Sequence, residues 1–192
     1  MGEALPRRTM DQDEYLSWEA EQAEKHEYLA GDIYAMVGVR REHALVAGAV
    51  YAALRERLKG SPCQAFVADM KLRVEAADAY FYPDVMVPCD PRDRSADTAI
   101  DHACLVIEVL SDSTAAFDRG AKFAAYRRLE SLQEYLLVDI EARRLELYRR
   151  EGSHWLLLES ESGSPALHLG SVGVSLDPAE AFEDLEPPPR DH

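Results

Sequence analysis

The sequence predicts an α+β domain, a mixed α/β arrangement in which a central mixed sheet is flanked by helices. Helical patterns stand before and after a run of short strands, which is typical of helices packed on a sheet. Residues 105–110 are apolar at every position except Glu108, as in a strand covered on both faces. The 192 residues suffice for one domain with a sizeable core.

The first third of the chain reads as helix, hairpin and helix. Residues 9–27 predict an N-terminal helix, capped by Asp11 or Asp13. Residues 28–39 predict a hairpin that turns at residues 29–32. Residues 42–58 carry apolar side chains and His43 at helical spacing, and the sequence Gly-Ser-Pro at 60–62 ends this helix.

The rest of the chain is rich in strands. We predict strands at 63–67, 70–74, 80–87 and 103–110, with a charged loop at 89–101 and a helix at 114–129. Further strands are predicted at 134–140, 143–149 and 154–158, and short ones near 165–169 and 172–176. We therefore expect a single domain over residues 1–182 and a disordered acidic, proline-rich tail at 183–192.

Composition limits the partners and the setting. The net charge of −15 and the pI near 4.8 count against nucleic-acid binding through bulk electrostatics. No apolar run reaches the roughly 20 residues of a membrane span, and no signal peptide is recognisable, so we expect no membrane partner. The three cysteines lack paired metal spacing, so we expect neither a disulfide nor a structural zinc, and we predict a reduced, cytoplasmic setting.

Two carboxylates stand out in the strand-rich part. Asp84 follows Pro83 at the head of one apolar strand, and Glu108 lies inside another. An ionised carboxylate inside a doubly covered strand is costly unless it is paired or binds a metal. If the two strands are neighbours, Asp84 and Glu108 can share Mg²⁺, with a main-chain carbonyl such as that of Val109 and water as further ligands.

A lysine would complete such a site. Lys122 shares a helix face with Asp118 and Tyr126, because these residues are spaced four apart. An ammonium beside a metal-bound water orients that water or stabilises the charge of a phosphate. Metal, water and ammonium together suit the hydrolysis of a phosphodiester.

Simpler interpretations stay open. Glu108 could be a core carboxylate paired with Lys122, Lys71 or an arginine, and Asp84 could serve only the turn after Pro83. Lys122 with Asp118 could be an exposed ion pair of little energetic value. Glu27 could be a solvated helix-end residue, and His43 a packed helix histidine.

Several of these segments together resemble the Uma2 family, which is similar to PD-(D/E)xK nucleases of the restriction-endonuclease-like fold. The resemblance covers nearly the whole chain and is carried by 25–28 with 31–32, His43, 69–71, 82–85, 107–111, Asp118, Lys122, Tyr126 and 134–139. It implies a mixed central sheet with helices on both faces.

The resemblance also implies roles for individual residues. Asp84 matches the first acid of the nuclease motif and Glu108 the second. The nuclease lysine stands two residues after the second acid, where this chain has Leu110, so its role falls to Lys122. Glu27 matches an additional acid that many such nucleases carry on an N-terminal helix.

The function expected is that of a metal-dependent endonuclease that hydrolyses phosphodiester bonds, with DNA as substrate, Mg²⁺ or Mn²⁺ as cofactor, and a homodimer as one arrangement. Two alternatives remain: a catalytically silent binding or regulatory module on a nuclease scaffold, and a hydrolase of a smaller phosphoester. Candidates for a local phosphate-binding surface are Arg40, Arg41, Lys71, Arg73 and Arg119.

Overall fold

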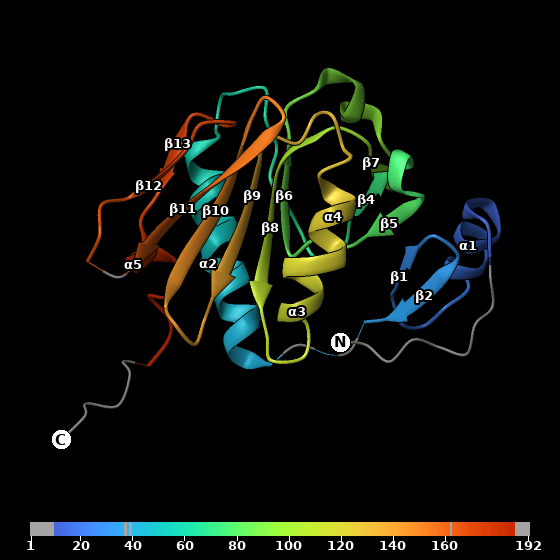
Figure 1. Cartoon of the computed structure of the whole chain (residues 1–192), viewed down its shortest axis with the longest axis horizontal. Helices are drawn as coiled ribbons and strands as arrows, with labels where there is room; N and C mark the ends of the chain where they lie inside the picture. The colour runs from blue at the N-terminus through green and yellow to red at the C-terminus, as the bar shows by residue number, and fades with distance from the viewer. Residues whose placement is uncertain (1–9, 37, 39, 162, 187–192) are drawn as a thin grey trace.

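The computed structural model describes residues 10–36, 38, 40–161 and 163–186, which form two main β-sheets and the helices packed against them (Figure 1). The α-helices are α1 (Gln12–Glu19), α2 (Arg41–Arg57), α3 (Ala115–Phe117), α4 (Phe123–Tyr126) and α5 (Pro178–Ala181), with 3₁₀ turns at Glu75–Ala77 and Pro91–Ser95 and a π-helical turn at Asp118–Lys122. The strands are β1 (His26–Leu29), β2 (Asp32–Ala35), β3 (Phe66–Val67), β4 (Lys71–Val74), β5 (Ala79–Phe81), β6 (Val85–Pro88), β7 (Ala99–Ile100), β8 (Ala103–Leu110), β9 (Glu134–Asp139), β10 (Arg144–Glu151), β11 (His154–Glu161), β12 (Leu167–Leu169) and β13 (Val174–Leu176). The predicted α+β class is confirmed.

The larger sheet is mixed and has helices on both faces. Its strand order is β11-β10-β9-β8-β6-β3, with β8 parallel to β9 and antiparallel to β6. Helix α2 covers one face and α3 with α4 the other, as Figure 1 shows, so Ile107 packs with the α2 side and Val106 with the α4 side. Burial on both faces explains why β8 is apolar almost throughout, as the sequence predicted. Glu108, in alternation with Ile107, lies on the α3–α4 side.

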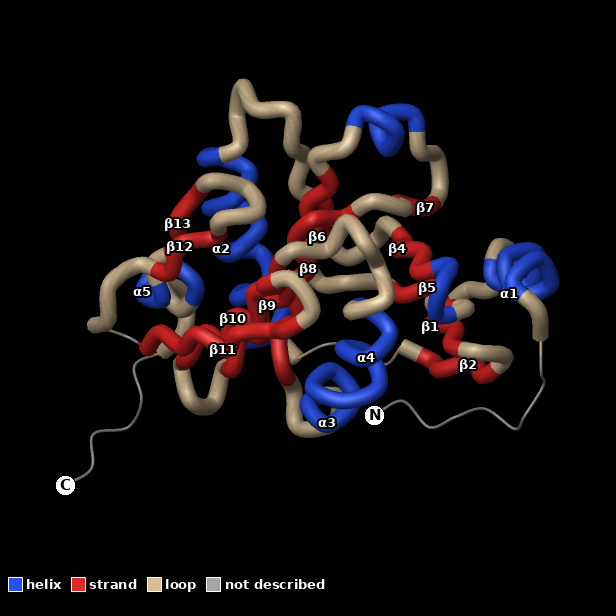
Figure 2. The backbone as a smooth tube through the Cα atoms, turned by 45° about the horizontal axis from the view of Figure 1, so that its top comes forward, coloured by secondary structure: helices blue, strands red, loops and turns tan. Residues whose placement is uncertain are grey.

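The smaller sheet has the order β2-β1-β5-β4-β7 and stands beside the larger one (Figure 2). Strands β1 and β2 form the predicted hairpin, and its turn residues Ala30 and Gly31 both have positive φ, as a two-residue hairpin turn requires. The predicted helix over 9–27 was too long. It ends at Glu19. Residues 26–29 pair with β2, and Tyr28 and Leu29 also pair with β5, so Glu27 lies in a strand rather than on a helix. Val37 and Val39, within the predicted hairpin, and Thr9 lie outside the described residues.

The chain crosses from the smaller sheet to the larger one at residues 82–84. We predicted one strand over 80–87, and this was wrong: β5 belongs to the smaller sheet and β6 to the larger. Pro83 has no N–H to give to a ladder, so the break falls there. Asp84 consequently stands at the head of β6, between the two sheets.

The helix predicted over 114–129 forms in three pieces. A π-helical turn from Asp118 to Lys122 separates α3 from α4. Single π-helical turns are rare in proteins, but those that occur are often found at functional sites. Here the turn carries two buried charged side chains, those of Asp118 and Lys122.

A disulfide joins Cys63 to Cys89, and this corrects our prediction that the cysteines are unpaired. Spacing along the chain gave no indication of the pair. The fold makes it, because the connection after α2 runs beside the end of β6, where the Gln64 N–H donates to the Pro88 carbonyl at 3.1 Å. The prediction of a reduced setting rested on unpaired cysteines and loses that support.

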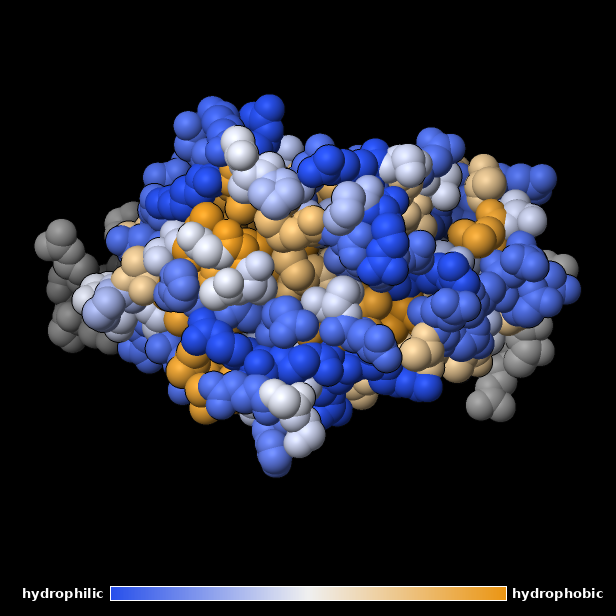
Figure 3. Space-filling model, turned by 90° about the horizontal axis from the view of Figure 1, so that it is seen from above, coloured by the Kyte–Doolittle hydropathy of each residue, from blue (hydrophilic) through white to orange (hydrophobic). Residues whose placement is uncertain are grey.

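Residues 167–185, near the C-terminus, pack on the same side of the larger sheet as α2. Leu167, Leu176, Phe182 and Leu185 join the core cluster on the α2 side. Leu185 belongs to the tail that we predicted to be disordered, so the packed domain extends at least that far; residues 187–192 lie outside the described residues. The face seen in Figure 3 is mainly hydrophilic, with small apolar patches. Within the described ranges, no helix is long and apolar enough to cross a membrane.

Candidate functional site

A pocket of about 90 Å³ lies where the two sheets meet the α3–α4 helix. Strand β1 supplies Glu27, helix α2 supplies His43, and β8 supplies Glu108. The π-helical turn supplies Asp118 and Lys122. The remaining lining residues are Tyr34, Ala35, Met36, Tyr82, Asp84, Val109, Thr114 and Phe117.

Asp84 and Glu108 lie next to each other, because β6 and β8 are neighbouring antiparallel strands. The Asp84 N–H points to Glu108 Oε2 at 3.4 Å, and the Val109 N–H donates to Asp84 Oδ2 at 2.8 Å. His43 Nε2 lies 3.2 Å from the same Oδ2. Asp84 therefore does more than shape the turn after Pro83: it links β6, β8 and α2.

Lys122 is buried among three carboxylates. Its Nζ lies 2.8 Å from Glu27 Oε1, 3.0 Å from Glu108 Oε1 and 3.8 Å from Asp118 Oδ1. The interpretation of Lys122 and Asp118 as an exposed ion pair is wrong, since both side chains are buried. The lysine displaced to the helix thus does reach the second acid. The same geometry satisfies the alternative in which Glu108 is a core carboxylate paired with Lys122.

Glu27 reaches the pocket from β1, an interior strand of the smaller sheet, and its side chain is buried, so it is not a solvated helix-end residue. Besides Lys122, its Oε1 accepts the Tyr82 N–H at 3.1 Å. The hydroxyl of Tyr82 donates to Glu19 Oε1 at 3.0 Å, and Glu19 also accepts the His26 N–H at 2.9 Å. This buried network fixes β1 against the crossing at residues 82–84, and it holds Glu27 in place.

The pocket holds more negative than positive charge. Burial raises the pKa of Glu108 well above its ordinary value; Lys122 opposes this rise, and the neighbouring acids Asp84, Asp118 and Glu27 add to it. Burial likewise raises the pKa of Asp118, against the effect of Lys122. Burial acts to lower the pKa of Lys122, but the surrounding carboxylates outweigh it and the pKa is well above normal. Protonated Lys122 alone does not balance these acids.

His43 interacts with the Asp84 carboxylate and with the backbone of Val109. Burial acts to lower its pKa, but the hydrogen bond and the charge of Asp84 outweigh this, with a further contribution from the Val109 backbone, so the pKa is raised. The histidine therefore does more than pack in its helix: it holds Oδ2 of Asp84.

Carboxylates of the pocket have the chemistry that a divalent metal requires of its ligands. Within the described residues no three or more His, Cys, Asp or Glu side chains are grouped as a ready-made metal site, and Glu27 and Glu108 are turned toward Lys122. Asp84 and Glu108 nevertheless offer hard carboxylate oxygens in a pocket with surplus negative charge. Mg²⁺ is commonly held by one or two carboxylates plus water, and a ligand is commonly fixed by a hydrogen-bonded neighbour, as His43 fixes Asp84. The residues thus fit Mg²⁺ or Mn²⁺ and not a softer metal.

Three residues of the site were given no firm role in it from the sequence. The Tyr126 hydroxyl donates to Glu108 Oε1 at 2.8 Å. Asp118 and His43 line the pocket. The spacing of 118, 122 and 126 on one helix face was a usable signal. For His43 the signal was its place in the family resemblance, because its contact with Asp84, distant in sequence, follows from no spacing along the chain.

Several candidates for the phosphate-binding surface are paired with carboxylates. Arg119 pairs with Glu146 and Asp139, and Arg73 pairs with Glu75. Exposed Arg40 pairs with Asp112. Lys71 Nζ, in contrast, lies 5.3 Å from the ring centroid of Tyr82, which lines the pocket, and Lys25 lies on the same ring at 5.5 Å.

Comparison with known proteins places the chain in a family. Residues 12–179 match the family model Uma2, described as "Putative restriction endonuclease". The chain belongs to the Uma2 family, and this membership points to a nuclease. Both curated relatives found come from Synechocystis sp. (strain ATCC 27184 / PCC 6803 / Kazusa). "Uncharacterized protein slr1290" is 40% identical over 90% of each chain. "Uncharacterized protein sll1609" is 37% identical over 76% of this chain and 84% of its own.

A solved structure shares the fold. It is described as the crystal structure of "a putative nuclease belonging to DUF820" from Anabaena variabilis ATCC 29413. The two structures superpose with a TM-score of 0.72, covering 91% of this chain and 98% of the other, at 16% sequence identity. At that identity the likeness establishes the fold alone.

Proposed function

We propose that the chain is a metal-dependent endonuclease that hydrolyses phosphodiester bonds of DNA. The observation that carries this proposal is the convergence of Asp84, Glu108 and Lys122 in one pocket at the junction of the two sheets. Asp84 directly precedes β6, Glu108 lies in β8 and Lys122 ends the π-helical turn, so the fold brings together residues up to 38 positions apart in the sequence.

Asp84 and Glu108 would hold Mg²⁺ or Mn²⁺, with Glu27 and the Val109 carbonyl as further candidate ligands. When bound, the cation supplies a polarised water and neutralises charge on the phosphate. Lys122, held on Glu108, is placed to orient that water or to stabilise the developing negative charge. His43 keeps Oδ2 of Asp84 engaged, which leaves Oδ1 for the pocket.

The pocket can admit a phosphate group of a larger substrate. Its volume is about 90 Å³, so the rest of such a substrate stays outside. A phosphodiester of DNA presented at the pocket mouth fits this arrangement.

Contacts to the DNA backbone would come from few residues, given the net charge of −15. Lys25 and Lys71, on the ring of Tyr82, are our candidates at the pocket, and Lys25 also pairs with Asp69. Phosphate contacts of this kind position the duplex without reading its sequence.

One observation favours a second candidate, the catalytically silent module. Lys122 is already engaged by Glu27 and Glu108, so the acids could serve folding alone. A silent module would keep this cluster and still lack cleavage.

The test is cleavage of supercoiled plasmid and of single-stranded DNA with Mg²⁺ or Mn²⁺. We expect wild type to cleave, and Asp84→Asn and Glu108→Gln to lose at least about 100-fold in rate while remaining folded. The matched control is Asp97→Asn, an exposed acid outside the pocket, which should cleave like wild type. Wild type without metal-dependent cleavage, or with cleavage untouched by Asp84→Asn and Glu108→Gln, would favour the silent module.

A further inference from the structure

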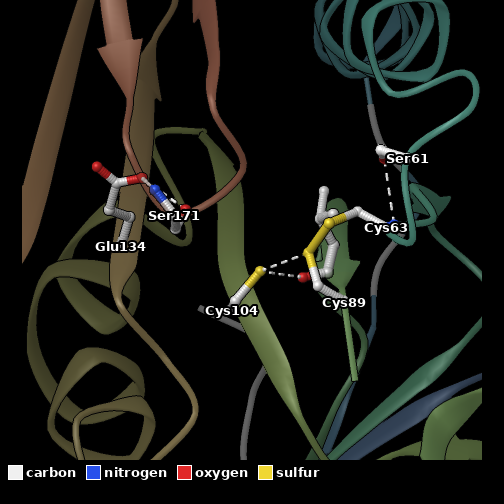
Figure 4. Close-up of a disulfide and its surroundings, with 7 residues drawn as sticks. Ser61, Cys63, Cys89, Cys104, Glu134 and Ser171 are labelled. Atoms are coloured by element: carbon white, nitrogen blue, oxygen red, sulfur yellow. Dashed lines mark hydrogen bonds between the residues drawn. A yellow bond between two sulfur atoms is a disulfide. The ribbon is translucent and has the colours of Figure 1, made fainter. Parts of the chain in front are cut away.

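A second reactive cluster lies away from the acid pocket and contains the three cysteines. Cys63 follows α2, Cys89 follows β6, and Cys104 lies in β8 (Figure 4). Cys63 and Cys89 form the disulfide, and the free sulfur of Cys104 lies 3.3 Å from Cys89 Sγ. All three side chains are partly exposed. The cluster is therefore a disulfide with a third thiol placed against one of its sulfur atoms.

We propose that Cys63, Cys89 and Cys104 form a thiol–disulfide exchange site in which Cys89 changes partner between Cys63 and Cys104. The separation of 3.3 Å falls within the roughly 3–3.5 Å of a near-attack arrangement. Cys104 is held there by the hydrogen bond from its thiol to the Val87 carbonyl, at 3.1 Å. The site is independent of the nuclease proposal, since none of its residues lines the acid pocket.

The exchange step balances without an external oxidant. The Cys104 thiol gives its proton to water, and the thiolate sulfur bonds to Cys89 Sγ while the Cys63–Cys89 bond breaks. Cys63 leaves as a thiolate and takes up a proton. One disulfide replaces another, with no net oxidation.

The two disulfides tie different parts of the fold together. The Cys63–Cys89 bond fastens the connection after α2 to the end of β6. A Cys89–Cys104 bond would join two strands that already pair, since Pro88 is opposite Ala103. Exchange therefore detaches the connection after α2 from the end of β6. Helix α2 is the helix that supplies His43 to the acid pocket. Exchange also turns Cys63 into a free, partly exposed thiol that a small-molecule disulfide can modify.

The exchange should be slow at neutral pH. Burial raises the pKa of the Cys104 thiol to about 11, and the nearby Glu134 adds to this. The thiolate is the attacking species, so the rate should rise about tenfold per pH unit below that value.

The test uses Cys63→Ser, with Cys104→Ser as the matched control. Each folded protein is treated with oxidised glutathione at pH 8, its thiols are blocked with N-ethylmaleimide, and its disulfides are mapped by mass spectrometry of peptides. We expect an intramolecular Cys89–Cys104 disulfide in Cys63→Ser and a Cys63–Cys89 disulfide in Cys104→Ser. Mixed disulfides with glutathione alone in Cys63→Ser would overturn the proposal.

A measurement on wild type covers the case in which Cys63→Ser does not fold. The native protein is incubated with N-ethylmaleimide at pH 7.5 and at pH 9, and the labelled positions are followed over time. If the disulfide exchanges, N-ethylmaleimide should label Cys63 as well as Cys104 in wild type, and faster at pH 9 than at pH 7.5. In Cys104→Ser it should not label Cys63. Label confined to Cys104 at both pH values would contradict the proposal.

Discussion

At the scale of single residues, the acid pocket is a costly arrangement of buried charges. Glu27, Glu108 and Asp118 surround one lysine and Asp84 adds a fourth carboxylate to the pocket, so the metal-free pocket contains uncompensated negative charge. Groups held in such a state are typical of sites that bind a cation or handle protons. Two substitutions measure this cost directly.

Replacing Glu108 by Gln should stabilise the metal-free protein. The pKa of Glu108 is raised in the folded state, so the folded state holds its proton more tightly, and stability falls as the pH rises above the ordinary glutamate pKa. Glutamine cannot ionise and avoids this loss. We expect a gain of about 1 kcal/mol in the free energy of unfolding at pH 7.5, measured by urea denaturation, and little gain near pH 4.

Glu141→Gln, in the exposed β9–β10 turn, is the control and should change stability by less than about 0.5 kcal/mol. A Glu108→Gln protein less stable than wild type at pH 7.5 would show that the glutamate is a stabilising partner of Lys122 and carries no strain.

Replacing Lys122 by Met should have the opposite effect. It leaves three buried carboxylates without their shared ammonium, which costs about 3–5 kcal/mol in unfolding free energy. Adding Glu27→Gln should recover part of the loss, because one charge fewer is then uncompensated. Exposed Lys59→Met is the control, and equal stabilities of Lys122→Met and wild type would refute the buried cluster.

At the scale of secondary-structure elements, the sequence predicted most of the helices, strands and turns, and failed where tertiary pairing decides. The apolar run of β8, the β1–β2 hairpin and α2 all follow from local patterns that agree with their surroundings. The N-terminal helix was predicted too long because the hairpin begins earlier than its pattern indicated: His26 and Glu27 pair with Ala35 and Tyr34 of β2. Pairing of Tyr28 and Leu29 with β5, some 50 residues away, also holds β1 in the sheet, and no local signal marks that partner.

The candidate site was likewise predictable only in part. Asp84, Glu108 and Lys122 could be selected because each is a charged residue in an otherwise apolar or helical pattern. The contact of His43 with Asp84 and the disulfide depend on how α2 crosses the sheet, which spacing along the chain does not encode.

One buried carboxylate outside the pocket holds an element in place. Glu134 of β9 accepts bonds from the Gly170 N–H, the Ser171 N–H and hydroxyl, and Arg149 Nε, at 2.6–3.1 Å. Figure 4 shows Glu134 beside Ser171. It thereby fastens the β12–β13 hairpin to the larger sheet. We expect Glu134→Ala to cost about 3 kcal/mol and to speed amide exchange in residues 167–176.

The amide hydrogen exchange measurement distinguishes a local role of Glu134 in holding the hairpin from a general loss of stability. Residues 118–126, on the far side of the sheet, should keep their protection at low denaturant. Unchanged exchange at 167–176 in Glu134→Ala would show that the hairpin is held by its apolar contacts alone.

At the scale of the whole molecule, the net charge of −15 sets how the protein could approach DNA. A local pair of cations would offset part of that repulsion, and our candidate is Lys71 with Lys25, which also pairs with Asp69. The double variant Lys25→Ala/Lys71→Ala should weaken DNA binding alike for all sequences. It should reduce the slope of log affinity against log salt by about 2.

Binding is measured by fluorescence anisotropy without divalent cations, so that no cleavage intervenes. The pair Lys59→Ala/Arg92→Ala, also exposed but not at the pocket, is the control. Equal losses of affinity in the two double variants would mean that total charge matters and the pocket lysines do not.

The central claim is that Asp84 and Glu108 together hold a divalent cation. Isothermal titration of the folded protein with Mn²⁺ tests it without any substrate. We predict one ion per chain for wild type, binding at least about tenfold weaker for Asp84→Asn and for Glu108→Gln, and unchanged binding for Asp97→Asn. Absence of Mn²⁺ binding by wild type, or equal affinity in Asp84→Asn, would contradict the account.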